Sequence, residues 1–179
     1  GHTSTSVSLA SGLAKGRDLN GESGNVIAVI GDGSLSGGEA LEGLDFAGEM
    51  DTNFIIVVND NDMSIAENHG GLYKNLKLLR DTDGKAECNL FRAMGLDYVF
   101  VKGGNDIPSL IAAFRQVKDS TKPVVVHIVT QKGKGYELAE QHKEQWHWCM
   151  PFDPATGKTT VSFGGDGDFG SFTCEYLQK

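Results

Sequence analysis

Three features are scarce in this chain: paired cysteines, long apolar runs and an excess of positive charge. The 179 residues include only Cys88, Cys149 and Cys174, with no C-x-x-C spacing, so we expect free thiols in a reducing compartment, the cytoplasm. No apolar stretch approaches the ~20 residues of a membrane span, and no secretory signal is expected. The formal net charge is −8, which argues against nucleic acid or an anionic membrane as a partner.

The chain begins without an initiator methionine, at Gly1-His2-Thr3-Ser4. We therefore expect it to be a piece of a longer protein. Its length suits one domain with a real core, and it contains no internal repeat. Little periodicity is expected after Glu137, and Gly164–Asp168 is predicted to be an exposed linker.

Apolar strand-like runs alternate with segments of helical spacing along most of the chain. This alternation predicts an α/β fold with a mainly parallel sheet flanked by helices. The predicted strands are Val26–Ile30, Phe54–Val58, Tyr98–Val101 and Val124–Val129. The predicted helices are Thr3–Leu19, Ser36 to about Gly48, Lys74–Met94 with a break at Asp81–Gly84, and a helix capped by Asp106 that runs to Val117.

Two of the predicted strands end in oxygen ligands. Asp32 lies between Gly31 and Gly33 directly after the first strand, and Asn61 follows the second. The carboxyl ends of parallel strands meet at one edge of a sheet, so we expect the two side chains on the same edge. A carboxylate and an amide oxygen suit Mg²⁺, whose remaining ligands are commonly phosphate and water. The N–H groups of Ser34 and Ser36 are candidates to bind the same anion. Alone, Gly-Asp-Gly is more typical of a simple tight turn, but its pairing with Asn59–Asn61 at the end of a second strand favours the metal site.

At these residues the chain resembles a known family. Gly31-Asp32-Gly33 followed by Asn61 is similar to the thiamine-diphosphate signature, GDG…N. Further stretches resemble the 1-deoxy-D-xylulose-5-phosphate synthases of the transketolase superfamily: Gly1–Ser6, Asn59–Ile65, Lys132–Tyr136 and Phe152–Gly157. Transketolases share the central signature but match the other stretches less well. The resemblance implies a three-layer thiamine-diphosphate-binding fold over residues 1–157, truncated at its N-terminus, with 158–179 as a linker towards a missing pyrimidine-binding domain.

The resemblance also implies roles for individual residues. Mg²⁺ would be bound by Asp32, Asn61 and the carbonyl of Met63. Thiamine diphosphate would contact Gly1, His2, Thr3, Gly33, Ser34, Asn61 and Tyr136. His147 and His2 would be catalytic. The implied reaction condenses pyruvate with glyceraldehyde 3-phosphate to 1-deoxy-D-xylulose 5-phosphate and releases CO₂. A homodimer is implied, with a pyrimidine-binding domain from the same or a second chain, and this chain alone is expected to be inactive.

Some positions depart from the family pattern, and alternatives stay open. The segment between Gly71 and Phe91 is much shorter than in the family. Asn105 takes the place of the histidine in the family's Gly-His-Asp motif, and two tryptophans flank His147. A transketolase acting on sugar phosphates and a non-catalytic module of the same fold are the alternatives. His127 is expected to be a hydrogen-bonded core residue rather than a catalyst. His69 and His142 are interpreted as surface residues, and Tyr136 as either a cofactor contact or a hydrophobic cap.

Overall fold

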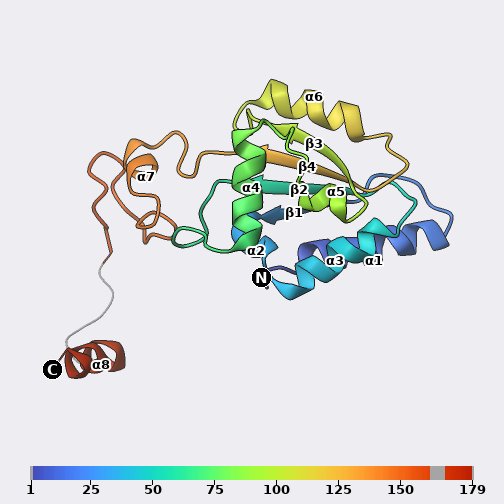
Figure 1. Cartoon of the computed structure of the whole chain (residues 1–179). Helices are drawn as coiled ribbons and strands as arrows, with labels where there is room; N and C mark the ends of the chain where they lie inside the picture. The colour runs from blue at the N-terminus through green and yellow to red at the C-terminus, as the bar shows by residue number, and fades with distance from the viewer. Residues whose placement is uncertain (1, 162–167, 179) are drawn as a thin grey trace.

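The core of the protein is a sheet of parallel strands. A computed structural model describes residues 2–161 and 168–178. Its 4-stranded sheet has the order β1-β2-β4-β3 (Figure 1). The strands are β1 (Ile27–Gly31), β2 (Ile55–Asp60), β3 (Asp97–Val101) and β4 (Val124–Val129), and every neighbouring pair is parallel. The predicted strands and the parallel sheet are confirmed, with ends that differ by at most two residues, as at β2, which runs to Asp60 where Val58 was expected.

Helices cover both faces of the sheet and make three layers (Figure 1). One face packs against α1 (Ser6–Leu19), α3 (Gly38–Gly48), α4 (Gly71–Asp81) and α5 (Leu90–Ala93). The other face packs against α6 (Ile107–Val117). Alternate residues of β2 point to opposite layers: Ile56 and Val58 join the first core, and Ile55 and Val57 join the second. β2 is buried on both faces, which explains its continuous apolar sequence.

Local signals explain where several helices begin. The Asp106 carboxylate accepts a hydrogen bond from the Ser109 N–H and caps α6, whose first turn contains Pro108. Asn89 caps α5 by accepting from the N–H groups of Phe91 and Arg92. The expected break after α4 is also present, because Asp83 and Gly84 both adopt positive φ there.

Three short helices were not predicted. One is α2 (Asp32–Leu35), which begins within the Gly31-Asp32-Gly33 motif. The other two lie after Glu137, where little periodicity was expected: α7 (Glu137–Gln141) and α8 (Phe169–Leu177). A five-residue helix is too short to show a period, and α8 has no buried residue that would create an apolar face. Gly164–Gly167 of the predicted linker lie outside the described residues.

Among the residues that the structure describes, no helix has the length and apolar character needed to cross a bilayer.

Candidate functional site

The residues singled out from the sequence meet at the carboxyl edge of β1 and β2. Gly31 pairs with Asn59 in the parallel register, so Asp32 and Asn61 leave the sheet at the same edge. Both line a cavity of about 740 Å³. The other residues that line it are Thr3, Gly31, Gly33, Ser34, Met63, Ser64, Ile65, Ala66, Lys132 and His147. The predicted meeting of the two strand ends is therefore observed.

Asp32 is a buried carboxylate held at the end of β1. Its side chain is 2% exposed, and its Oδ2 accepts a hydrogen bond of 2.8 Å from Nδ2 of Asn68. Burial and the nearby charge of Asp60 raise the pKa of Asp32 to about 6, although the N–H groups of Gly33 and Met63 oppose this rise. A carboxylate destabilised in this way gains from a nearby cation.

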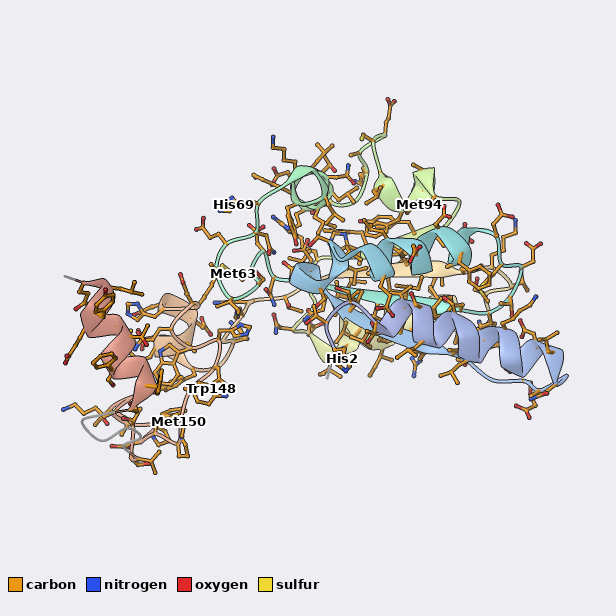
Figure 2. All side chains as sticks on the ribbon, turned by 90° about the horizontal axis from the view of Figure 1, so that it is seen from below. His2, Met63, His69, Met94, Trp148 and Met150 are labelled. Carbon is orange, nitrogen blue, oxygen red and sulfur yellow. The ribbon has the colours of Figure 1, made fainter. Side chains whose placement is uncertain are left out.

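Asn61 and Met63 lie on the loop that follows β2. Oδ1 of Asn61 accepts a hydrogen bond of 3.2 Å from the Met63 N–H, which folds the loop back on itself. Met63 also pairs with Glu67 in an isolated bridge, and the Ser64 N–H donates to the carbonyl of Ala66. Figure 2 shows Met63 on this loop, near the beginning of α2.

Gly33 is required by a close approach between this loop and α2. A Cβ atom on Gly33 would lie 2.5 Å from Cβ of Ser64, a distance that real side chains do not adopt. The hydroxyl of Ser4 donates to the carbonyl of Ser34 at 2.7 Å and thereby fixes the N-terminal segment, including Thr3, against α2. Ser36 lies outside the cavity lining, and its hydroxyl oxygen accepts a hydrogen bond from the Tyr73 hydroxyl.

Lys132 and His147 bring the segment after β4 to the cavity. Nζ of Lys132 donates to the carbonyl of Ser64 and lies 2.9 Å from Nδ1 of His147. Because an ammonium group only donates, Nδ1 of His147 accepts, which places the proton of the neutral ring on Nε2. Burial lowers the pKa of Lys132, and the charge of Asp32 partly opposes this effect.

Two other predicted site residues, Tyr136 and His2, are not part of the lining of this cavity. Tyr136 packs against Trp146 and Phe152, at centroid distances of 5.1 and 5.6 Å, and its hydroxyl donates to the carbonyl of Pro154. His2 is exposed and outside the lining, whereas Gly1 lies outside the described residues. The positions of Tyr136 and His2 do not test their proposed roles, so the roles of all three residues stay predictions.

The remaining histidines follow their predictions. His127 is fully buried, with Nε2 2.9 Å from Asp60 and Nδ1 2.7 Å from the Tyr98 hydroxyl. It is therefore a hydrogen-bonded core residue, as expected. His69 and His142 are both exposed.

The donor set of the cavity fits a hard divalent cation. Nowhere in residues 2–161 and 168–178 do three His, Cys, Asp or Glu side chains gather as a metal cluster. The cavity is instead lined by Asp32, Asn61 and Met63, whose carboxylate, amide and backbone carbonyl are the candidate oxygen ligands. An oxygen-only set with one carboxylate suits Mg²⁺ that completes its octahedron with phosphate and water, and it does not suit zinc.

Sequence reasoning missed three residues that support this edge: Asn68, Ser64 and Arg80. Asn68, which contacts Asp32, and Ser64, which lies against Gly33, belong to the polar segment after β2. The polar residues of this segment show no regular spacing that would predict which of them face the site. Arg80 of α4 donates hydrogen bonds to the carboxylate of Asp60 at the end of β2, a contact that nothing in the sequence of this helix indicates. Nothing in the sequence indicated which of its many polar residues would face Asp32 or the loop.

Comparisons with known proteins agree with the geometry. A family model described as 1-deoxy-D-xylulose-5-phosphate synthase matches residues 1–87 and 79–130. The 1-deoxy-D-xylulose-5-phosphate synthase of Desulforudis audaxviator is 41% identical over 89% of this chain and 31% of its own length. That of Listeria monocytogenes is 42% identical over 88% of this chain and 27% of its own length. The chain thus spans roughly a third or less of these relatives.

Solved structures share the fold. A transketolase from Campylobacter jejuni matches with a TM-score of 0.59 and 25% identity, over 79% of this chain and 21% of its own. A putative thiamin diphosphate-dependent enzyme from Mycobacterium smegmatis matches with a TM-score of 0.51 and 20% identity, over 73% of this chain and 23% of its own. The three-layer thiamine-diphosphate-binding fold predicted from the sequence is therefore confirmed. Together with the family model and the relatives in sequence, this fold shows that the chain belongs to the 1-deoxy-D-xylulose-5-phosphate synthase family.

Proposed function

We propose that this chain is the diphosphate-binding part of an enzyme that uses thiamine diphosphate and Mg²⁺ to transfer two-carbon units. The reaction proposed is the condensation of pyruvate with glyceraldehyde 3-phosphate to 1-deoxy-D-xylulose 5-phosphate, with loss of CO₂. The observation that carries the proposal is the convergence of Asp32, Asn61 and Met63 on one cavity, at the edge where two parallel strands end. Membership of the family supports the choice of reaction.

The cavity supplies groups for the metal and for an anionic tail. Asp32, Asn61 and the carbonyl of Met63 would bind Mg²⁺, and the N–H groups of Gly33 and Ser34 would bind the diphosphate, with Thr3 alongside. Lys132 adds a positive charge to the cavity wall. When bound, thiamine diphosphate supplies the nucleophilic carbon that carries the two-carbon unit, while the protein orients the reactants.

His147 is the proposed catalytic residue with support from the geometry. Its Nδ1 is occupied by Lys132, so the Nε2–H of the neutral ring is free to donate a hydrogen bond to a substrate oxygen. The residue lines the same cavity as Asp32. The catalytic role of His2 rests on the family resemblance alone.

Several proposals concern the whole protein rather than this chain. Because the chain covers 31% of the Desulforudis relative, a pyrimidine-binding domain from the same or a second chain would complete the site. The resemblance to the family is the basis on which we propose a homodimer in the cytoplasm, with residues 158–179 as the connection to that domain. We expect no turnover from this chain alone.

The test is calorimetry of thiamine diphosphate binding to the full-length protein with and without Mg²⁺. We expect Mg²⁺-dependent binding that Asp32→Ala abolishes, and that Asp45→Ala, an exposed control on α3, leaves intact. Absence of binding by the full-length protein would refute the proposal and favour a non-catalytic module.

A transketolase reaction is the second candidate, supported by the similarity to the Campylobacter transketolase. The two reactions differ in the two-carbon donor. Turnover of the full-length protein with pyruvate supports the synthase, whereas turnover with a ketose phosphate and none with pyruvate supports the transketolase.

A further inference from the structure

Arg80 of α4 holds both residues that flank the proposed metal ligand Asn61. Its Nη1 lies 2.7 Å from each carboxylate oxygen of Asp60, and its Nη2 lies 2.6 Å from Oδ1 of Asp62. One guanidinium group therefore spans the peptide segment on either side of Asn61. A lysine has no planar fork and cannot reproduce this arrangement.

Burial distinguishes the two halves of this arrangement. The side chain of Asp60 is 0% exposed and that of Arg80 is 16% exposed, whereas that of Asp62 is 62% exposed. Burial alone would raise the pKa of Asp60, but hydrogen bonds from His127 and Arg80 outweigh it and keep the pKa low. The Arg80–Asp60 pair is an anchor in the protein interior, and Asp62 is the point at which that anchor holds the exposed loop.

The loop needs such an anchor because its backbone is unusual. Asp62 adopts a φ of +63°, which L-residues other than Asn and Asp rarely accept. Its N–H donates a hydrogen bond of 3.1 Å to Oδ1 of Asp60, and the same carboxylate is held from β4 by His127. The turn that aims Asn61 and Met63 at the cavity is thereby fixed from α4 and from the sheet.

Neither aspartate lines the cavity that holds Asp32. Asp60 and Asp62 are therefore not candidates for direct ligands there, and their contribution acts through the loop. Side chains that orient metal ligands from outside the coordination sphere commonly change metal affinity when removed.

We propose that Arg80 is a positioning residue that sets the geometry of the Mg²⁺ ligands Asn61 and Met63 through Asp60 and Asp62. This inference rests on the proposed function. A positioning role can be distinguished from that of an ordinary structural ion pair. If Arg80 were only structural, its replacement would lower the stability of the protein and leave the Mg²⁺ affinity of the folded protein unchanged.

The test measures the Mg²⁺ affinity of the full-length protein at saturating thiamine diphosphate, by calorimetry, together with the Mg²⁺ activation constant and kcat. Arg80→Gln is expected to weaken Mg²⁺ binding about tenfold, with kcat at saturating Mg²⁺ nearly retained. Arg80→Lys should fall in between. Lys77→Gln is the matched control, since Lys77 forms an exposed ion pair with Asp81 on the same helix, and it should match the wild type.

A second variant keeps the test decisive if Arg80→Gln does not fold. Asp62→Asn removes the exposed half of the arrangement and keeps a residue that tolerates positive φ, so it should fold and still lose Mg²⁺ affinity about threefold. The double variant Arg80→Gln/Asp62→Asn should bind Mg²⁺ no more weakly than Arg80→Gln, because the Asp62 carboxylate has already lost its guanidinium partner in Arg80→Gln. Wild-type Mg²⁺ affinity in folded Arg80→Gln or in Asp62→Asn would overturn the inference. Failure of the wild type to bind Mg²⁺ would instead overturn the proposed function.

Discussion

Nδ2 of Asn68 lies 2.8 Å from Oδ2 of Asp32, so the end of the loop after β2 is joined directly to the end of β1. The hydrogen bond comes from a neutral amide and does not neutralise the carboxylate. Within the described part of the chain, no cationic side chain donates a hydrogen bond to Asp32, which is therefore a buried acid with the charge of Asp60 nearby. We interpret this as an acid arranged to receive a metal ion, at a cost to the stability of the metal-free protein.

This cost predicts how the stability of the metal-free protein changes with pH. The pKa of Asp32 is raised from 3.8 to about 6 in the folded protein. Between these values the folded state keeps a proton that the unfolded state has lost, so the contribution of Asp32 to the free energy of unfolding falls as pH rises through this window. In the presence of a chelator, we expect Asp32→Asn to be more stable than the wild type at pH 7, by about 1 to 3 kcal/mol.

The difference should nearly vanish at a pH of about 4, where Asp32 is largely protonated in the folded protein. Urea unfolding at the two pH values measures it, and Asp45→Asn on the exposed side of α3 is the control. An equal difference in the free energy of unfolding between the variant and the wild type at both pH values would show that burial does not destabilise the ionised form of Asp32.

A methyl group at Gly33 should force the loop away from α2. Because the added Cβ would lie 2.5 Å from Cβ of Ser64 and 3.0 Å from its Cα, the loop that carries Met63 must shift. We expect Gly33→Ala to destabilise the protein by about 1 to 3 kcal/mol and to weaken Mg²⁺-dependent binding of thiamine diphosphate. Thermal unfolding and calorimetry measure the two effects.

Gly12→Ala is the matched control for this change. Gly12 lies in α1, and apart from its chain neighbours and the backbone of that helix no described atom lies within 4 Å of its added Cβ. Alanine there should stabilise the helix by about 0.5 to 1 kcal/mol. If Gly33→Ala behaved like Gly12→Ala, the close approach of Ser64 to α2 would have no energetic meaning.

The Tyr98 hydroxyl should contribute to stability through His127. It lies 2.7 Å from Nδ1 of His127, whose Nε2 contacts Asp60, and burial raises the pKa of Tyr98. Tyr98→Phe leaves the buried Nδ1 without its partner, so we expect a loss of about 1 to 2 kcal/mol in the free energy of unfolding. Urea denaturation measures it. Tyr176→Phe, at an exposed position on α8, should change nothing, and an equal effect in both variants would contradict the account.

Much of this fold could be predicted from the sequence because its signals are local. The run of apolar residues in β2 is continuous because both faces of this strand are buried. The start of α6 was predictable because the Asp106 side chain caps that helix. The convergence of Asp32 and Asn61 was also predictable from the two apolar strand sequences, because the carboxyl ends of neighbouring parallel strands lie at the same edge of the sheet.

What the sequence did not predict depends on contacts between distant segments. Arg80 meets Asp60 across 20 positions and Asn68 meets Asp32 across 36, and no periodicity encodes such pairs. Tyr136 illustrates the same limit, since its packing against Trp146 and Phe152 depends on how an irregular segment folds back.

The most direct test of the account is a crystal structure of the full-length protein with thiamine diphosphate and Mn²⁺ in place of Mg²⁺. Manganese is located by its anomalous scattering. We predict one peak about 2 Å from the Asp32 carboxylate, the Asn61 amide oxygen and the Met63 carbonyl, with diphosphate oxygens on its other side. A cofactor bound with its metal elsewhere, or with Asp32 still bonded only to Asn68, would contradict the central claim.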